Sequence, residues 1–376
     1  YRETAPSQLN IKTEPATITA SGVALTTQPV VEITDAYDNV IRNDSTSEVK
    51  AEIFSGDNGT LLGTQTVAVT DGIATFTDLA LQGPVGQTYR LRFTSLGLYA
   101  TASTDITINA PGPVDLAVSG ITADPVGNLT ADGIETSVLA ITVTDTYGNP
   151  ITGESVVLAL SDATGRTLAA STGTTNAIGQ VATTLASTVA GITTVNAYLN
   201  SEDAANLIGS VDVGFLAGEP AKLQVISGNG QTGEVAQALN NPLRVRVRDA
   251  QDNVVAGASV VFAGDGTTQP APGVATSDAT GLAELTWVLG EVAGQQSITA
   301  TLAGSDPAVD VTFIATAEPG PPAQFGFVLA DQRQLSTIPF DVDVVLQDAY
   351  GNTTVADSAL TVSLTANNTS KVANIV

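Results

Sequence analysis

The chain has 376 residues and carries 38 acidic against 13 basic residues, which gives a net charge of −25 at neutral pH. Such a surface repels nucleic acids and anionic membranes, so both are disfavoured as partners. Cysteine, histidine and methionine are absent. Their absence excludes disulfides, zinc–thiolate and haem sites and the usual Ser–His or Cys–His catalytic pairs, so no cofactor is expected.

Hydrophobic residues make up 43% of the sequence, which is enough for packed cores rather than disorder. The chain does not begin with methionine and its first residues do not form a signal peptide, so we expect it to be a segment of a longer protein. No apolar run reaches the ~18 residues that a membrane-spanning helix requires.

A five-residue motif recurs four times, with aspartate first and asparagine last. It begins at Asp35, Asp145, Asp249 and Asp348, roughly 100 residues apart. A period of about 100 residues corresponds to one small domain, so the chain is a tandem array. Proline-bearing joints separate the units and predict domains at residues 1–110, 111–217, 218–317 and 318–376. The last unit is expected to be incomplete, because it lacks the later strands of the pattern.

In chain order, each unit begins with a short apolar segment that predicts a strand. These segments are Leu9–Ile11, Val114–Val118, Leu223–Ile226 and Phe325–Val328. A second strand then runs into the repeated aspartate; in the third unit Leu243, Val245 and Val247 alternate with arginines, the period-two pattern of a strand with one buried face.

Further strands follow the aspartate turn and predict the rest of each unit. They include Ser155–Leu160 and Ala258–Phe262 after the turn, and the later strands Thr88–Thr94, Gly191–Leu199 and Gly294–Leu302. Many short strands with frequent turn signals indicate an all-β fold of tandem Ig-like β-sandwiches in an elongated rod. No segment shows the periodicity of a capped helix.

The second unit contains the segments ITVTDTYGNPITGESVVLAL (141–160) and AGITTVNAYL (190–199). These segments resemble bacterial Ig-like domains of the invasin and intimin type. The third unit is similar to the same family, and the first and fourth units resemble it more loosely. The resemblance implies sandwiches stacked as stalks in bacterial surface adhesins and other secreted proteins, and it implies no catalytic or ligand site.

The four repeated aspartates are the weak candidates for metal ligands, because carboxylate oxygens suit calcium. Each one follows a buried strand at a tight turn and has few acidic neighbours. We therefore interpret Asp35, Asp145, Asp249 and Asp348 as turn caps that accept hydrogen bonds from free amides, and we expect no metal site.

Three other features allow two interpretations each. Arg244, Arg246 and Arg248 form a basic stripe, which is either a solvated strand face with acidic cross-strand partners or a contact for a neighbouring acidic chain. The turn tyrosines form either a recognition stripe or a cover over the turn; they are Tyr37, Tyr147 and Tyr350, with Gln251 in the third unit. Trp287, the single tryptophan, is predicted in the core rather than in a sugar-binding site.

These features favour a non-enzymatic stalk of a secreted or surface-anchored bacterial protein. Its partner would be a receptor or neighbouring copies of itself, without nucleic acid and without membrane insertion in this segment. One alternative is a subunit of an extracellular filament, sheath or surface layer. A further alternative is an accessory region of a secreted polysaccharide-active enzyme, although an aromatic content of 5% disfavours it.

Overall fold

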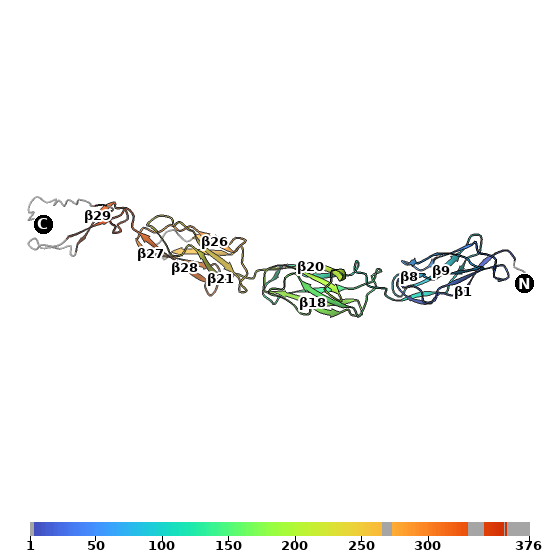
Figure 1. Ribbon diagram of the computed structural model, residues 1–376. Helices are drawn as coiled ribbons and strands as arrows, with labels where there is room; N and C mark the ends of the chain where they lie inside the picture. Colours follow the sequence, from blue (N-terminus) through green and yellow to red (C-terminus); the bar gives the residue numbers. More distant parts are fainter. Residues whose placement is uncertain (1–3, 265–272, 330–341, 357, 359–376) are drawn as a thin grey trace, which may run out of the picture. The chain divides into compact units, whose positions relative to one another are not determined.

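A computed structural model describes residues 4–264, 273–329, 342–356 and 358 (Figure 1). The chain forms two compact units, Tyr1–Leu216 and Ala217–Val376. The first unit contains two β-sandwiches, and the described residues of the second form a third sandwich followed by one more strand pair. Among the described residues, no helix has the length and apolar character needed to cross a lipid bilayer.

The first sandwich contains eleven strands. They are β1 (Gln8–Thr13), β2 (Ile18–Ala20), β3 (Val30–Thr34), β4 (Glu48–Ser55), β5 (Thr60–Leu62), β6 (Thr66–Ala68), β7 (Ile73–Thr75), β8 (Ala80–Gln82), β9 (Thr88–Thr94), β10 (Thr101–Ala102) and β11 (Ile106–Ala110). The sheets have the orders β1-β3-β7, β2-β11-β9-β4-β6 and β5-β8, and β10 pairs with β9. Residues from all of these layers form one buried core that includes Phe76, Tyr89 and Phe93.

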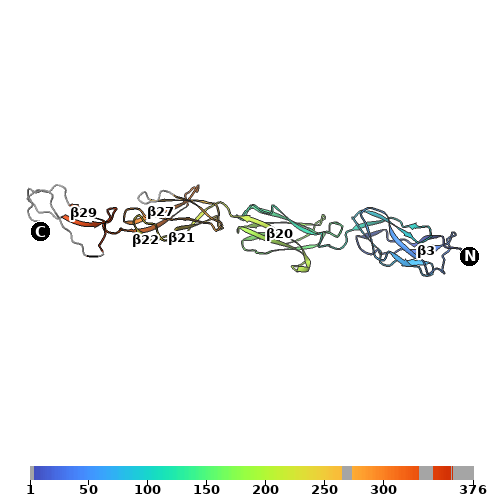
Figure 2. The same cartoon turned by 90° about the horizontal axis from the view of Figure 1, so that it is seen from above.

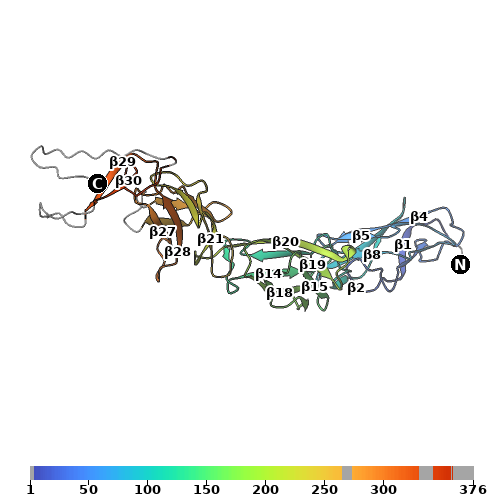
Figure 3. The same ribbon diagram turned by 60° about the vertical axis from the view of Figure 1, so that its left-hand side comes forward.

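The second sandwich has nine strands in two sheets, whose labelled strands can be followed in Figure 3. They are β12 (Gly120–Asp124), β13 (Leu129–Thr130), β14 (Thr136–Thr142), β15 (Ser155–Leu160), β16 (Arg166–Leu168), β17 (Thr172–Thr174), β18 (Gln180–Ser187), β19 (Gly191–Leu199) and β20 (Leu207–Leu216). One sheet has the order β12-β14-β18-β16 and the other β13-β20-β19-β15-β17. A 3-10 turn, η1 (Ala204–Asn206), connects β19 to β20.

The third sandwich follows the same plan, with eight strands among its described residues, several of which Figure 2 labels. They are β21 (Lys222–Ser227), β22 (Gln231–Glu234), β23 (Leu243–Arg248), β24 (Ser259–Gly264), β25 (Gly273–Thr276), β26 (Leu282–Leu285), β27 (Gly294–Leu302) and β28 (Asp310–Glu318). Its sheets have the orders β21-β23-β26 and β22-β28-β27-β24-β25. Leu243, Val245 and Val247 on β23 are fully buried while the arginines between them face outward, because successive side chains of a strand point to opposite faces.

All three sandwiches divide their opening strand between the two sheets. The first half pairs antiparallel with the strand that ends at the repeated aspartate, as β1 does with β3. The second half pairs parallel with the last strand of the sandwich, as β2 does with β11, β13 with β20 and β22 with β28. The last strand of each sandwich is thereby fixed beside the first, at the point where the chain leaves for the next joint.

The opening segment of the second sandwich differs from its prediction. Residues Val114–Val118 form a turn, and strand β12 begins only at Gly120. The side chain of Asp115 accepts a hydrogen bond from the N–H of Ala117, and its carbonyl accepts one from the N–H of Ser119. These local bonds satisfy amides that a strand would direct to a neighbour, so the apolar composition of the segment does not decide its conformation.

The predicted fourth domain is described only in part. Strands β29 (Gln324–Leu329) and β30 (Val342–Gln347) form an antiparallel pair and lead to the turn at Asp348. Residues 330–341, 357 and 359–376 lie outside the described part of the chain. Whether this domain is incomplete therefore stays a prediction, as do the four domain boundaries.

Candidate functional site

The four repeated aspartates have the same hydrogen bonds within their own turns. One carboxylate oxygen of each, Oδ1, accepts two backbone N–H groups, from the residue two positions on and from the asparagine four positions on. For Asp145 these donors are Tyr147 at 2.9 Å and Asn149 at 3.0 Å. The same pairs occur at the other three turns. The carboxylate therefore replaces backbone acceptors that a tight turn lacks.

The second carboxylate oxygen, Oδ2, binds the chain that enters from the joint. It accepts the N–H of Gly112 at Asp145, of Gly218 at Asp249 and of Gly320 at Asp348, at 2.8 to 2.9 Å. At Asp35 the donor is Thr4. Each aspartate is almost completely buried. In all four repeats, the aspartate side chain thus joins the incoming linker to the turn.

The backbone conformation at the fourth position of the motif explains why this position holds glycine or aspartate. Its φ is positive in all four turns, at Asp38, Gly148, Asp252 and Gly351. This left-handed conformation is open to glycine and is tolerated by aspartate and asparagine better than by most residues. The turn then directs the asparagine side chain back towards the aspartate, where its Nδ2 donates to the carboxylate.

The hydrogen bonds also control the ionisation of these carboxyl groups. Burial alone would raise the pKa of Asp145, but the bonds from Asn149, Gly112 and Tyr147 favour the charged form and hold the pKa below the usual 3.8. The same balance of causes lowers the pKa of Asp249 and Asp348. At Asp35 the bond from Thr4 is the largest cause of a lowered pKa. The turns are therefore anionic at neutral pH.

The asparagine of the second turn reaches across the joint into the first sandwich. Nδ2 of Asn149 donates to the carbonyl oxygen of Gly83 at 3.0 Å, and Oδ1 accepts the N–H of Val85 at 2.8 Å. Gly83 and Val85 lie in the loop between β8 and β9. We call this arrangement, an asparagine amide held between a loop carbonyl and the N–H two residues later, the amide clamp.

The same clamp joins the third sandwich to the strands that follow it. Nδ2 of Asn352 donates to the carbonyl oxygen of Glu291 at 2.7 Å, and Oδ1 accepts the N–H of Ala293 at 2.8 Å. Glu291 and Ala293 lie in the loop between β26 and β27. The two clamps therefore use the same atoms and the same two-residue spacing, on loops of different sequence.

Buried polar side chains hold both loops in place. The hydroxyl of Ser21 donates to the carbonyl of Gly83 and accepts the N–H of the same residue. In the third sandwich the side chain of Gln296 accepts the N–H of Gly290 and donates to the carbonyl of Val292. Both side chains are almost inaccessible to solvent. A loop fixed in this way presents its carbonyl and N–H to the clamp without a further loss of entropy.

The turn tyrosines take different positions in the described structure. The hydroxyl of Tyr147 forms a hydrogen bond of 2.6 Å with the hydroxyl of Thr60, across the joint in the first sandwich. Tyr37 is 77% exposed and Tyr350 is 49% exposed. Tyr147 is therefore part of a joint, and a role of the three tyrosines in recognition stays a prediction.

The turns offer little to a metal ion. Among the residues that the structure describes, no three acidic side chains gather closely enough to hold a metal. Both carboxylate oxygens of Asp145 face N–H donors, which repel a cation. Hard cations such as calcium need six to eight oxygen ligands, and the turn supplies amide hydrogens instead.

The predicted basic stripe lies on the outward face of β23. Arg244 forms an ion pair of 2.7 Å with Glu284, its cross-strand neighbour on β26. Arg248 donates to the carbonyl of Asp252, and the Nε of Arg246 is buried without a hydrogen-bond partner in the described part of the chain. A contact of this stripe with another chain stays a prediction. Trp287 is fully buried in the core of the third sandwich, which leaves no exposed ring for a sugar.

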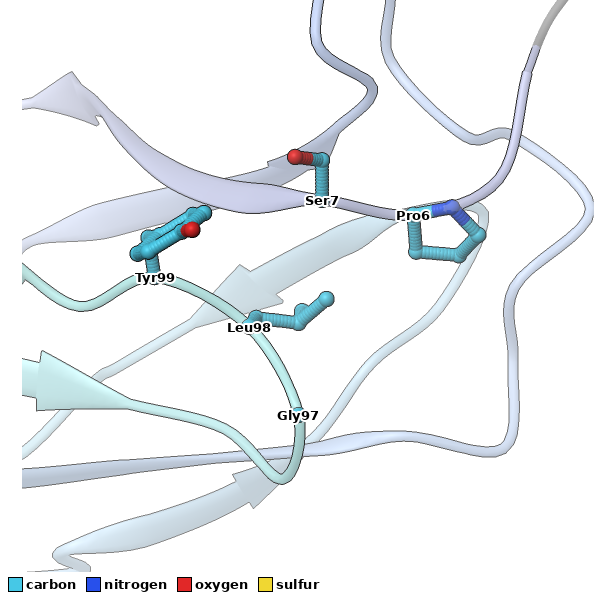
Figure 4. Close-up of a pocket in the computed structure, with 5 residues that line it drawn as sticks. All are labelled: Pro6, Ser7, Gly97, Leu98 and Tyr99. Carbon is cyan, nitrogen blue, oxygen red and sulfur yellow. The ribbon is translucent and has the colours of Figure 1, made fainter.

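A shallow hollow lies at the end of the first sandwich that carries the Asp35 turn. Its lining consists of Pro6, Ser7, Gly97, Leu98 and Tyr99, as Figure 4 shows. The backbone of Tyr99 pairs with Ser7 and Leu9, so the wall is rigid. The lining contains hydroxyls, from Ser7 and Tyr99, but no carboxylate, lysine or histidine that could activate them as nucleophiles.

Comparison with known protein families gives two matches, one in the second sandwich and one in the third. Residues 120–216 and 236–314 match the model of the bacterial Ig-like domain (group 1). The second and third sandwiches are bacterial Ig-like domains. This match confirms the resemblance for the two units that carry it most clearly. The sequence matches no curated protein.

Solved structures that resemble these bacterial Ig-like domains include the Escherichia coli adhesin FdeC. It is 19% identical with a TM-score of 0.39, over 84% of this chain and 100% of that one. Invasin, a bacterial integrin-binding protein, is 17% identical with a TM-score of 0.42, over 86% and 63% of the two chains. The S-layer protein rSbsC is 16% identical with a TM-score of 0.32, over 96% and 46%.

The clamp in these Ig-like domains was not predicted from the sequence. The asparagine at the end of each motif was visible as a repeat, at Asn39, Asn149, Asn253 and Asn352. In all four turns Nδ2 of this asparagine donates to the aspartate, and this bond within the turn accounts for the constant amide. The repetition therefore did not reveal the partners that Asn149 and Asn352 have in a neighbouring loop.

Proposed function

We propose that this chain is a non-enzymatic spacer in a secreted or surface-anchored bacterial protein, where it holds a binding region away from the cell. The observation that supports this proposal most strongly is the amide clamp at Asn149 and again at Asn352. A spacer must keep its sandwiches in a defined relation under load. A clamp that fixes both a donor and an acceptor restricts bending and rotation at the two joints that contain it.

Composition and the described sites agree with this proposal. The family match supports a bacterial source for the chain. An acidic sequence with no cysteine suits an extracellular protein stabilised by packing alone. The buried polar groups described above serve turns and loops, which is the expected use of such groups in a structural protein.

Solution size tests the spacer proposal. Strands of 8–10 residues at ~3.3 Å per residue, with their turns, give a sandwich about 40 Å in length. A spacer of this chain should therefore be monomeric, with a maximum dimension above about 120 Å in small-angle X-ray scattering. Sedimentation velocity on the same sample provides the control for association. A compact particle would contradict the spacer, and concentration-dependent assembly would favour the filament or surface-layer alternative.

A further inference from the structure

The first sandwich carries the same turn as the others at the end where the chain enters. Oδ2 of Asp35 accepts the N–H of Thr4 at 3.0 Å, and Oδ1 accepts the N–H groups of Tyr37 and Asn39. These bonds are the ones that Asp145 forms with Gly112 and its own turn. The end of the first sandwich therefore contains a complete turn of the kind that builds a joint.

The asparagine of this turn has an open acceptor. Both hydrogen bonds of the Asn39 side chain come from Nδ2 and go to Asp35. In the described part of the chain, Oδ1 of Asn39 has no hydrogen-bond partner. The corresponding Oδ1 atoms of Asn149 and Asn352 each accept an N–H from a loop of the preceding sandwich. Asn149 is only 7% exposed, whereas Asn39 is half-buried.

A second observation at the same end is the exposure of Tyr37. Its ring is 77% exposed. Tyr147, at the same position of its motif, is half-buried and bonds to Thr60 of the preceding sandwich. The amide oxygen of Asn149 and the side chain of Tyr147 both contact the preceding sandwich at the first joint. The equivalent groups of Asn39 and Tyr37 have no such contact among the described residues. The Asp35 turn lacks only the groups that another sandwich supplies.

We infer that the Asp35 turn, with Asn39 and Tyr37, is a docking face for the loop of another Ig-like sandwich. The loop must present a carbonyl oxygen and, two residues later, a backbone N–H, as Gly83 with Val85 and Glu291 with Ala293 do. In both clamps the last strand of the docked sandwich leads directly to the residue whose N–H binds the aspartate. The occupant is therefore a sandwich joined in series on the Thr4 side. This inference depends on the joint geometry and not on the spacer role.

A duplicated chain tests the docking face. A second copy of residues 4–111 replaces residues 1–3, so that Pro111 of the copy leads directly into Thr4 of the full chain. The copy carries Tyr37→Phe, so that only the original Tyr37 can react. Both the duplicated and the unaltered chain are treated with tetranitromethane, and nitration of each tyrosine is followed by mass spectrometry. Tyr147 serves as the reference for a tyrosine within a joint.

Docking of the copy should reduce nitration of Tyr37 at least fivefold, to the rate of Tyr147. Equal nitration of Tyr37 in the duplicated and unaltered chains would overturn the inference. Protection of Tyr37 that rises with concentration in the unaltered chain would also overturn it, because the face would then bind a second molecule rather than a sandwich in series. Neither measurement reports on the spacer role, which scattering tests separately.

The contribution of Asn39 is tested in the duplicated chain with Asn39→Ala. Loss of the clamp should return the nitration of Tyr37 to its rate in the unaltered chain. Tyr89, which is fully buried in the first core, must remain unmodified and shows that the variant is folded. Protection of Tyr37 that persists in the folded variant would overturn the assignment of Asn39. If the variant does not fold, the comparison of duplicated and unaltered chains still decides the docking face.

Discussion

The joint after the first sandwich and the joint after the third contain the same clamp but support it differently. Asn149 and Asn352 each hold a loop carbonyl and the N–H two residues later. The first loop is held by a serine, and the second by a glutamine. The turn and its amide are thus constant, while the loop that they bind is fixed by whatever buried polar group its own sandwich supplies.

The linker glycines also differ between the two joints. A Cβ on Gly112 would lie 2.3 Å from the carbonyl oxygen of Ser21, which is backbone and cannot move aside. The nearest atom to a Cβ on Gly320 would be Glu234 Oε1 at 3.2 Å, at the end of a flexible side chain, and the atoms of Asp348 would lie at ordinary contact distance. The first joint is therefore closely packed around its linker, and the second leaves room. This difference shows that the hydrogen bonds, rather than tight packing, are the common element of the joints.

The largest effect is expected from removal of the aspartate. Asp145→Ala leaves the N–H groups of Gly112, Tyr147 and Asn149 without their acceptor, which should destabilise the second sandwich by about 2 kcal/mol. Native-state hydrogen exchange of the β14 amides measures this loss. The fluorescence of Trp287, in the third sandwich, is the control and should keep its unfolding midpoint. Asp348→Ala should increase the hydrogen exchange of the β30 amides to a similar extent. Unchanged exchange in both variants would show that the aspartate caps do not stabilise these strands.

Substitution of the linker glycine by alanine should destabilise the first joint more than the second. Gly112→Ala forces the chain away from Ser21 and should cost about 2 kcal/mol, since overpacking of a fixed backbone contact is typically this costly. Gly320→Ala requires only a side-chain adjustment and should cost less than about 0.5 kcal/mol. Urea unfolding of the two variants provides the comparison. Equal losses would mean that the packing difference between the joints has no energetic consequence.

Acid should weaken every turn, because the aspartate pKa values are lowered in the folded chain. A group with a lowered folded pKa stabilises the fold above its unfolded value, here the usual 3.8, and loses this contribution as the pH falls through the folded pKa. The free energy of unfolding of the second sandwich should therefore fall below about pH 4. The decrease should be smaller in Asp145→Ala than in the unaltered chain. Parallel pH profiles would contradict the ionised cap.

The sequence predicted the elements whose signals are local and did not predict those that depend on distant partners. The strands predicted at Ser155–Leu160, after the aspartate turn, and at Gly191–Leu199, near the end of the second unit, are β15 and β19 with the same bounds. The prediction of a strand at residues 114–118 was wrong, because Asp115 accepts hydrogen bonds from amides of this region and holds it in a turn. The partners of Asn149 lie more than 60 residues away in another sandwich. No pattern near the motif specifies them, and the repeated asparagine is already accounted for by its bond to the aspartate within the turn.

A smaller effect is expected when only the clamp is removed. Asn149→Ala loses two hydrogen bonds across the joint and one to Asp145, while the other caps of the turn remain, so we expect a loss of about 1 kcal/mol. Hydrogen exchange of the Val85 amide should accelerate in this variant. Asn39→Ala, which removes only bonds to Asp35 in the unaltered chain, is the matched control and should cost less. Equal costs would show that the bonds to Gly83 and Val85 do not stabilise the joint.

Calcium should have the smallest effect, at both joints alike. A ligand stabilises a fold appreciably only when its concentration exceeds its dissociation constant for the folded state. Both oxygens of Asp145 and of Asp348 already accept N–H donors, so a bound cation would have to displace these amides and recruit further oxygens. Thermal unfolding with millimolar calcium and with chelator should therefore agree within about 1 °C. A shift of several degrees in one unit alone would show that one of the two joints holds a cation and that the aspartates are ligands there rather than caps.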